Sequence, residues 1–131
     1  MSSNEFKMSA TFSATPEQIF DAWMSGEGHS QMTGSKARVQ KRSGGKFSAW
    51  DGYIYGATLV VQRPRRIVQA WRTSEFPEDS PDSRVDIRLE ETQGGTKLTL
   101  RHSIIPDGQA ESYKQGWEDF YFKPMKEYFK K

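Results

Sequence analysis

Residues 113–128 read YKQGWEDFYFKPMKEY, and their pattern gives the clearest indication of the fold. Large apolar side chains recur in it at helical spacing: Tyr113, Trp117, Phe120, Tyr121, Met125 and Tyr128. This period predicts one long C-terminal helix whose wide aromatic face packs against a core. Pro124 lies inside that helix and removes one backbone donor, so we expect a kink that lets the helix follow a curved sheet.

The residues before this helix alternate between apolar and polar side chains, as half-buried strands do. Leu98 and Leu100 point to one face of their strand, and the same count turns His102 inward. From residue 36 onward, turns rich in glycine and proline separate about six strands. Asp51-Gly52 gives the strongest hairpin signal, because a two-residue type I′ turn needs positive φ at both positions.

The N-terminal residues predict one more strand and two short helices. The strand is indicated by the alternation of Phe6, Met8, Ala10 and Phe12 with polar residues. Thr15 is expected to cap a helix that has Pro16 at its first position, with Gln18 completing a capping box. A second short helical segment is predicted for residues 27–32 and ends before Gly34.

This order of elements predicts a single domain, residues 1–131, of the α+β class with a helix-grip fold. A curved antiparallel β-sheet of about seven strands, with two short helices, carries the long C-terminal helix over its concave face and encloses an apolar cavity. The chain has no cysteine, which suits a reducing compartment and favours the cytoplasm. Neither a signal peptide nor an apolar membrane span is evident, so no membrane partner is expected.

Several short motifs resemble one known family. They are Gly44-Gly45-Lys46-Phe47, Asp51-Gly52 with Gly56 after it, Ile67-Val68, Trp71-Arg72, Gln115-Gly116-Trp117 and Tyr121-Phe122. From Phe12 to Phe129 the chain resembles the C-terminal domain of activators of the heat-shock-protein-90 ATPase, a branch of the START-like (SRPBCC) superfamily. The resemblance implies the helix-grip fold. It leaves the function open, because this superfamily includes lipid carriers, polyketide cyclases and co-chaperones.

Aromatic side chains from the inner strands and the last helix predict a ligand cavity, since such walls are typical of small-molecule sites. The candidate cavity residues are Trp71, His102, Trp117, Phe120, Tyr121 and Tyr55. His102 is expected to orient a polar ligand group near neutral pH. The alternative is that these rings simply fill the core. Alternation places Tyr53 and Tyr55 on one face without saying which face that is.

Enzyme signatures are scarce. The chain has two histidines, His29 and His102, and neither metal-binding spacing nor a nucleophile elbow. Asp107 is expected to cap the last helix rather than to act with Glu111 as an acid–base pair. We therefore expect a non-enzymatic domain with no metal and no cofactor, and a cyclase or hydrolase is the less favoured reading.

Residues 36–66 hold eight basic residues and one acid. Six of them could dock an acidic protein partner: Lys41, Arg42, Lys46, Arg63, Arg65 and Arg66. The alternative is solvated turns with surface ion pairs. Nucleic-acid binding is not expected at a net charge of +2.

The leading hypothesis is a domain, monomeric or weakly dimeric, that binds a small hydrophobic or amphipathic ligand in its cavity. The alternative is a protein-interaction module that acts on a heat-shock-protein-90-type chaperone.

Overall fold

The computed structural model describes residues 4–130. These residues form one seven-stranded sheet whose neighbouring strands are antiparallel, in the order β1-β7-β6-β5-β4-β3-β2. The elements are β1 (Phe6–Phe12), α1 (Pro16–Trp23), α2 (Gly26–Thr33), β2 (Arg38–Val39), β3 (Lys46–Ala49), β4 (Ile54–Gln62), β5 (Arg66–Thr73), β6 (Ser83–Thr92), β7 (Gly95–Ser103), α3 (Ala110–Trp117), the π-helical segment η1 (Glu118–Phe122) and α4 (Lys123–Tyr128).

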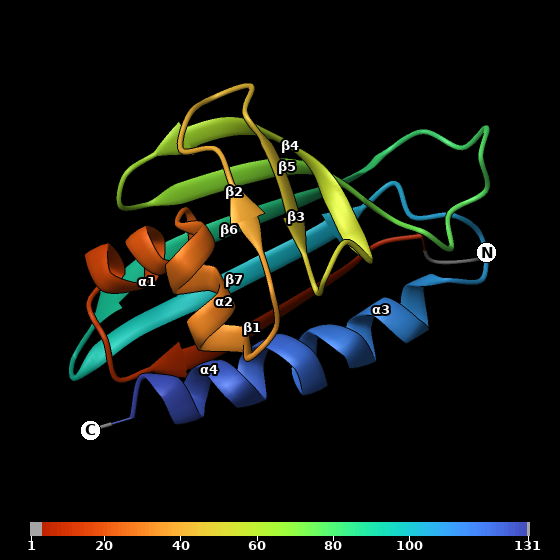
Figure 1. Cartoon of the computed structure of the whole chain (residues 1–131). Helices are drawn as coiled ribbons and strands as arrows, with labels where there is room; N and C mark the ends of the chain where they lie inside the picture. Colours follow the sequence, from red (N-terminus) through yellow and green to blue (C-terminus); the bar gives the residue numbers. More distant parts are fainter. Residues whose placement is uncertain (1–3, 131) are drawn as a thin grey trace.

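The C-terminal helical run α3-η1-α4 lies along the sheet, and α1 and α2 pack beside its far end (Figure 1). The predicted α+β helix-grip fold, with about seven antiparallel strands, two short helices and a long C-terminal helix, is therefore confirmed. Within the described residues, no helix has both the length and the apolar character needed to cross a bilayer.

The two short helices begin at side-chain caps. The Thr15 hydroxyl accepts a hydrogen bond from the Gln18 backbone N–H at 3.1 Å, and Gln18 Oε1 accepts from the Thr15 N–H at 2.8 Å, which confirms the capping box. Helix α2 starts at Gly26, one residue before the predicted segment, and ends at Thr33, with Gly34 as its C-cap. A Cβ on Gly28 would lie 2.8 Å from Ala22 Cα, so glycine permits the close contact between the two helices.

The hairpin between β3 and β4 is longer than predicted. Ala49 pairs with Ile54, so four residues form the loop, and the predicted two-residue turn was wrong. Positive φ does occur at Asp51 and Gly52, and also at Trp50, with values of 55°, 91° and 51°. The left-handed backbone conformation is unusual for tryptophan, because its Cβ then crowds the backbone. This conformation places the Trp50 ring against Phe120 of the C-terminal helix, in an edge contact with centroids 5.3 Å apart.

The distortion expected at Pro124 takes the form of a π-helical turn. Proline has no N–H for the carbonyl of Phe120, and the preceding Lys123 N–H donates to Glu118, five residues back. Side chains four residues apart drift around an α-helix, which has about 3.6 residues per turn. The wider π turn offsets that drift, so Trp117 and Tyr121 both face the sheet.

Two expectations about this helix were wrong. Phe120 was counted on its core face, but its ring is 54% exposed while Phe122 is buried, because the π turn changes which side chains face inward. Asp107 was expected to cap the helix. The cap position is instead Gln109, which makes no side-chain capping bond, and Asp107 Oδ1 accepts a hydrogen bond from Asn4 Nδ2 at 2.8 Å.

Trp117 lies at the centre of the contact between helix and sheet. Its ring packs against Trp23, Trp71 and Tyr121, with centroids 6.1, 5.7 and 4.6 Å away. Three elements of the chain, α1, β5 and η1, therefore meet on one side chain.

Trp117→Ala should lower the free energy of unfolding by about 3–5 kcal/mol, because a large ring leaves a cavity that its neighbours cannot fill. Phe120→Ala is the matched control on the same helix, and its exposed ring should cost less than about 1 kcal/mol. Denaturant unfolding measures both. Equal losses in the two variants would show that Trp117 does not hold helix and sheet together.

Candidate functional site: an aromatic pocket under the C-terminal helix

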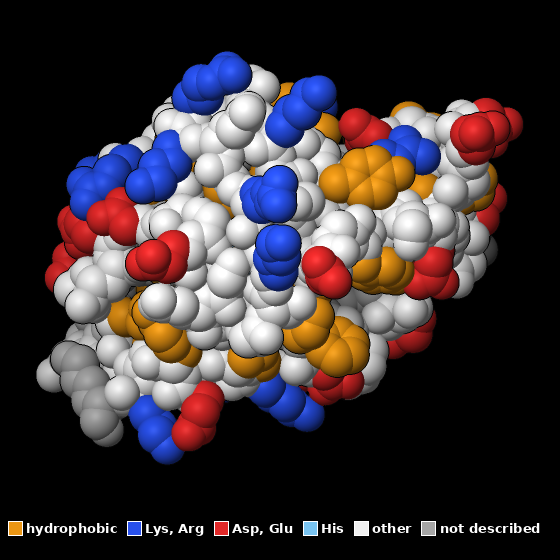
Figure 2. Space-filling model, in the orientation of Figure 1, with side chains coloured by type: hydrophobic (Ala, Val, Ile, Leu, Met, Phe, Trp, Pro, Cys, Tyr) orange, Lys and Arg blue, Asp and Glu red, His pale blue; other side chains and the backbone are white. Residues whose placement is uncertain are grey.

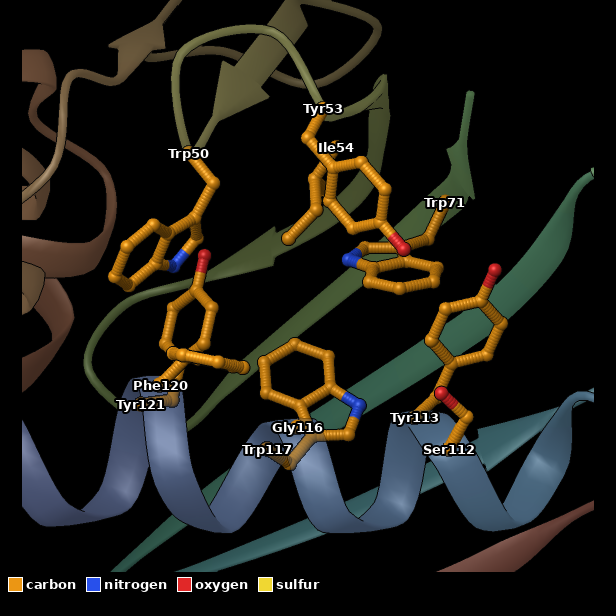
Figure 3. Close-up of a pocket in the computed structure, with 10 residues that line it drawn as sticks. All are labelled: Trp50, Tyr53, Ile54, Trp71, Ser112, Tyr113, Gly116, Trp117, Phe120 and Tyr121. Carbon is orange, nitrogen blue, oxygen red and sulfur yellow. The ribbon is translucent and has the colours of Figure 1, made fainter. Parts of the chain in front are cut away.

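A pocket of about 350 Å³ opens between the C-terminal helix, the β3–β4 loop and strands β4 and β5. Such a volume lies within the range of about 300–1,000 Å³ that small-molecule sites occupy. Figure 3 shows its side chains converging from the helix below and from the loop and strands above. The lining residues are Trp50, Tyr53, Ile54, Trp71, Ser112, Tyr113, Gly116, Trp117, Phe120 and Tyr121.

Four of the six predicted cavity residues meet in this lining: Trp71, Trp117, Phe120 and Tyr121. His102 and Tyr55 lie outside it. Sequence reasoning missed Trp50, because no sequence pattern predicts a tryptophan with positive φ in this loop. It also gave no pocket role to Tyr113, although this residue belongs to the aromatic stripe that was identified.

His102 is fully buried behind the pocket wall and does not belong to the lining, contrary to the prediction. The Trp117 Nε1–H donates to His102 Nδ1 at 3.1 Å, so the histidine proton is on Nε2. That Nε2–H donates to the Ser83 hydroxyl at 2.8 Å, which in turn donates to the Trp71 carbonyl oxygen at 2.6 Å. Both ring nitrogens therefore have protein partners, and His102 orients Trp117 instead of a ligand.

His29, to which sequence analysis gave no role, supports the opposite end of the pocket. Its Nδ1 lies 3.0 Å from the Trp23 carbonyl oxygen, which can only accept, so the proton is on Nδ1. The Tyr121 hydroxyl then donates to His29 Nε2 at 2.7 Å. The two buried histidines thus carry their protons on opposite nitrogens, and each fixes one aromatic ring of the lining.

Tyr55 was placed in the cavity by prediction, but it points away from it. Its side chain is 41% exposed and lies opposite Arg72 on the neighbouring strand β5. Tyr53 lines the pocket instead. Alternation could not relate the two tyrosines, because Tyr53 belongs to the four-residue loop and Tyr55 to strand β4.

Tyrosine hydroxyls form the polar end of the pocket. Tyr53 donates a hydrogen bond to the Glu75 carboxylate. Tyr113 donates to Gln109 Oε1 at 2.6 Å and also lies 2.7 Å from Thr73 Oγ1. Burial raises the pKa of both Tyr53 and Tyr113, so both hydroxyls keep their protons at neutral pH. The lining itself contains no charged side chain.

The predicted partner surface divides into paired and unpaired cations. Arg63 makes two hydrogen bonds of 2.8 Å to Asp21, and Arg66 makes two to Asp86 at 3.2 and 2.9 Å. For these two arginines the structure agrees with the alternative of surface ion pairs. Within residues 4–130, the other four make no ion pair: Lys41, Arg42, Lys46 and Arg65. Lysine and arginine side chains gather on the face shown in Figure 2.

Comparison with known proteins gives consistent matches. A family model described as activator of Hsp90 ATPase homolog 1-like protein matches residues 13–130. The human activator of 90 kDa heat shock protein ATPase homolog 1 is 28% identical over 119 residues, 91% of this chain and 35% of that protein. The chain therefore spans only a part of this relative.

Solved structures extend the comparison. The crystal structure of an HSP90 activator from Plasmodium falciparum is 28% identical, with a TM-score of 0.83, and the match covers 91% of both chains. CalU16 from Micromonospora echinospora is 23% identical with a TM-score of 0.81, and the match covers 96% of this chain and 74% of that one. At this lower identity, the likeness to CalU16 shows the shared fold alone.

The two buried histidines predict a loss of stability in mild acid. Burial lowers the pKa of His29 to about 4 and that of His102 to about 3. The unfolded chain takes up these protons near pH 6.5, so their contribution to stability is complete above that pH and is lost as the pH falls toward the folded values. Between pH 7 and pH 5 the free energy of unfolding should fall by about 2 kcal/mol for each histidine.

Denaturant unfolding at the two pH values measures this loss. His29→Gln and His102→Gln should each remove one histidine's share of the pH dependence. The carboxyls of Asp21 and Asp86, whose pKa values arginine partners hold below the usual range, do not titrate in this window. Equal stability of the wild-type protein at pH 7 and pH 5 would contradict the neutral, buried state of both rings.

Proposed function

Because this chain belongs to the activator of Hsp90 ATPase homolog 1-like family, we propose that it works as a non-enzymatic START-like domain that binds a small apolar or amphipathic molecule. The ligand lies in the pocket between the sheet and the C-terminal helix. The observation that carries this proposal is the pocket itself: an open volume of about 350 Å³ remains where a purely structural core would be filled.

The chemistry of the walls supports an apolar occupant. Aromatic rings surround the space on the helix side and on the loop side, and the edge contact of Trp50 with Phe120 forms part of its rim. Phe120 is more than half exposed without a ligand. Covering these rings with an apolar molecule removes their surface from water, which favours binding.

Gly116→Leu tests this site by filling it. A Cβ at Gly116 would meet only Phe120 Cδ2, at 3.8 Å, so the longer side chain has room to enter the pocket. The uncharged fluorescent probe N-phenyl-1-naphthylamine should bind the wild-type protein and bind Gly116→Leu at least about tenfold more weakly. Leucine also favours the helix more than glycine does, so the melting temperature should not fall.

Gln115→Leu is the matched control, because it adds the same side chain one residue earlier at an exposed position outside the lining. It should leave probe affinity unchanged. Failure of the wild-type protein to bind the probe at tens of micromolar, together with an empty pocket in native mass spectrometry of protein from its own host, would reject the ligand hypothesis.

A second candidate function is action on a heat-shock-protein-90-type chaperone in the cytoplasm. It is favoured by the Plasmodium falciparum structure, which is described as an HSP90 activator and is matched over 91% of its solved chain. A single domain of this size therefore makes up nearly all of that structure. The unpaired cations Lys41, Arg42 and Lys46 offer a surface for acidic groups of such a partner.

Reversing Lys41, Arg42 and Lys46 to Glu should weaken binding to purified heat-shock protein 90 at least about tenfold at low salt, and less at high salt, because screening shortens the reach of these charges. Lys7, Lys97 and Lys126 reversed together are the matched control, since they are exposed and change the net charge equally. Calorimetric titration measures both. Equal weakening in the two triple variants would assign the effect to net charge. No weakening in either variant would show that this surface does not bind the chaperone.

A further inference from the structure

Trp71 is a buried residue whose indole N–H is accessible from the open space of the pocket and has no protein partner. Its side chain is 4% exposed and lies on β5. Figure 3 shows its indole nitrogen directed toward the space between Ile54 and Trp117. Among residues 4–130, no atom accepts a hydrogen bond from this Nε1–H. The nitrogen is not among the enclosed side-chain atoms that lack a partner, so it is accessible from the pocket. A ligand that fills the pocket covers this N–H and must supply an acceptor, because a donor left unpaired on burial weakens binding.

The other three tryptophans make the contrast clear. Trp23 donates to Gln69 Oε1 at 3.4 Å, and Trp117 donates to His102 Nδ1 at 3.1 Å. The Trp50 Nε1–H has no partner either, but protein atoms enclose it completely, so a ligand cannot reach it in this conformation. Trp71 is therefore the tryptophan whose N–H is both free and accessible from inside the pocket.

The remaining polar groups of the pocket cannot substitute for Trp71 as buried donors. Tyr53, Tyr113 and Tyr121 already donate their hydroxyl protons to Glu75, Gln109 and His29. The Ser112 hydroxyl lies at the exposed rim, where water competes for it. A ligand atom deep in the pocket therefore meets one donor, the indole of Trp71.

Charge narrows the choice of ligand further. No lysine, arginine or histidine lines the pocket, so nothing there compensates a buried anion. The Glu75 carboxylate, bonded to Tyr53 at the polar end, adds a repulsion against negative groups. Carboxylates and phosphates are therefore disfavoured as ligands, both by the lack of a cation in the lining and by the nearby Glu75 carboxylate.

We propose that the pocket selects an uncharged, flat apolar molecule that carries a hydrogen-bond acceptor, such as a ketone, and that the Trp71 Nε1–H donates to this acceptor. This inference rests on the proposed ligand-binding function and adds the chemical class of the ligand. The aromatic walls hold the flat body, and Trp71 fixes its orientation.

Three naphthalene probes separate the effects of apolar contact, a hydrogen-bond acceptor and charge on binding affinity. Naphthalene has no acceptor, 2-acetonaphthone has a ketone, and 2-naphthoate carries a negative charge. Wild-type protein should bind the ketone about threefold to tenfold more tightly than naphthalene, the usual gain from one hydrogen bond. The carboxylate should bind most weakly. In ¹⁵N–¹H spectra the indole resonance of Trp71, assigned by its loss in Trp71→Phe, should shift with the ketone and much less with naphthalene.

Trp71→Phe should bind naphthalene and the ketone with equal affinity. Trp50→Phe, the matched control in the same lining, should weaken both probes alike and so keep the preference for the ketone. The spectra of the wild-type protein test the same contact without any substitution, in case Trp71→Phe does not fold. Equal affinity of the wild-type protein for both neutral probes, or a preference that follows Trp50, would overturn the inference while leaving the proposed function intact. Binding of no probe would reject the ligand-binding function itself.

Discussion

The hydrogen bond from Trp117 Nε1 to His102 is the contact on which the grip of the helix on the sheet depends. It begins a chain of bonds that runs through Ser83 to the backbone of Trp71 and so joins the helix to β7, β6 and β5. A buried histidine must be neutral and fully bonded to be tolerated, and each nitrogen of His102 has one partner. The same contact turns the Trp117 ring toward the pocket.

Much of the fold could be predicted from sequence, because periodicity and capping are local. The capping box at Thr15, the inward turn of His102 and the number of strands all followed from spacing. The role of His102 could not be predicted from spacing, since alternation tells which face a side chain points to but not which atoms it contacts there. Tyr55 was assigned to the cavity although alternation did not say which face it points to. The link to Tyr53 also failed, because Tyr53 lies in the loop before β4.

The errors in the last helix have a different origin. Spacing assigned Phe120 to the core face on the assumption of a regular α-helix, whereas the π turn before Pro124 exposes it and buries Phe122. Sequence analysis did predict a cavity under this helix, but it did not identify the residue that leaves the space open. Gly116 leaves that space, because a side chain there would point into the pocket with only Phe120 nearby. The position of a cavity depends on which side chains are absent, whereas hydrophobic periodicity reports only the side chains that are present.

The pocket and the cationic surface use separate residues. None of the unpaired cations lines the pocket, and no charged side chain belongs to its walls. Membership of the family does not tell whether the pocket or the cationic surface carries the function, because one scaffold supports several functions through different sites. The proposed ligand binding uses the aromatic walls and one indole N–H, whereas the proposed docking uses charges at the β2–β3 end of the sheet. The two proposed functions are therefore compatible in one chain, and a substitution that removes one should leave the other measurable.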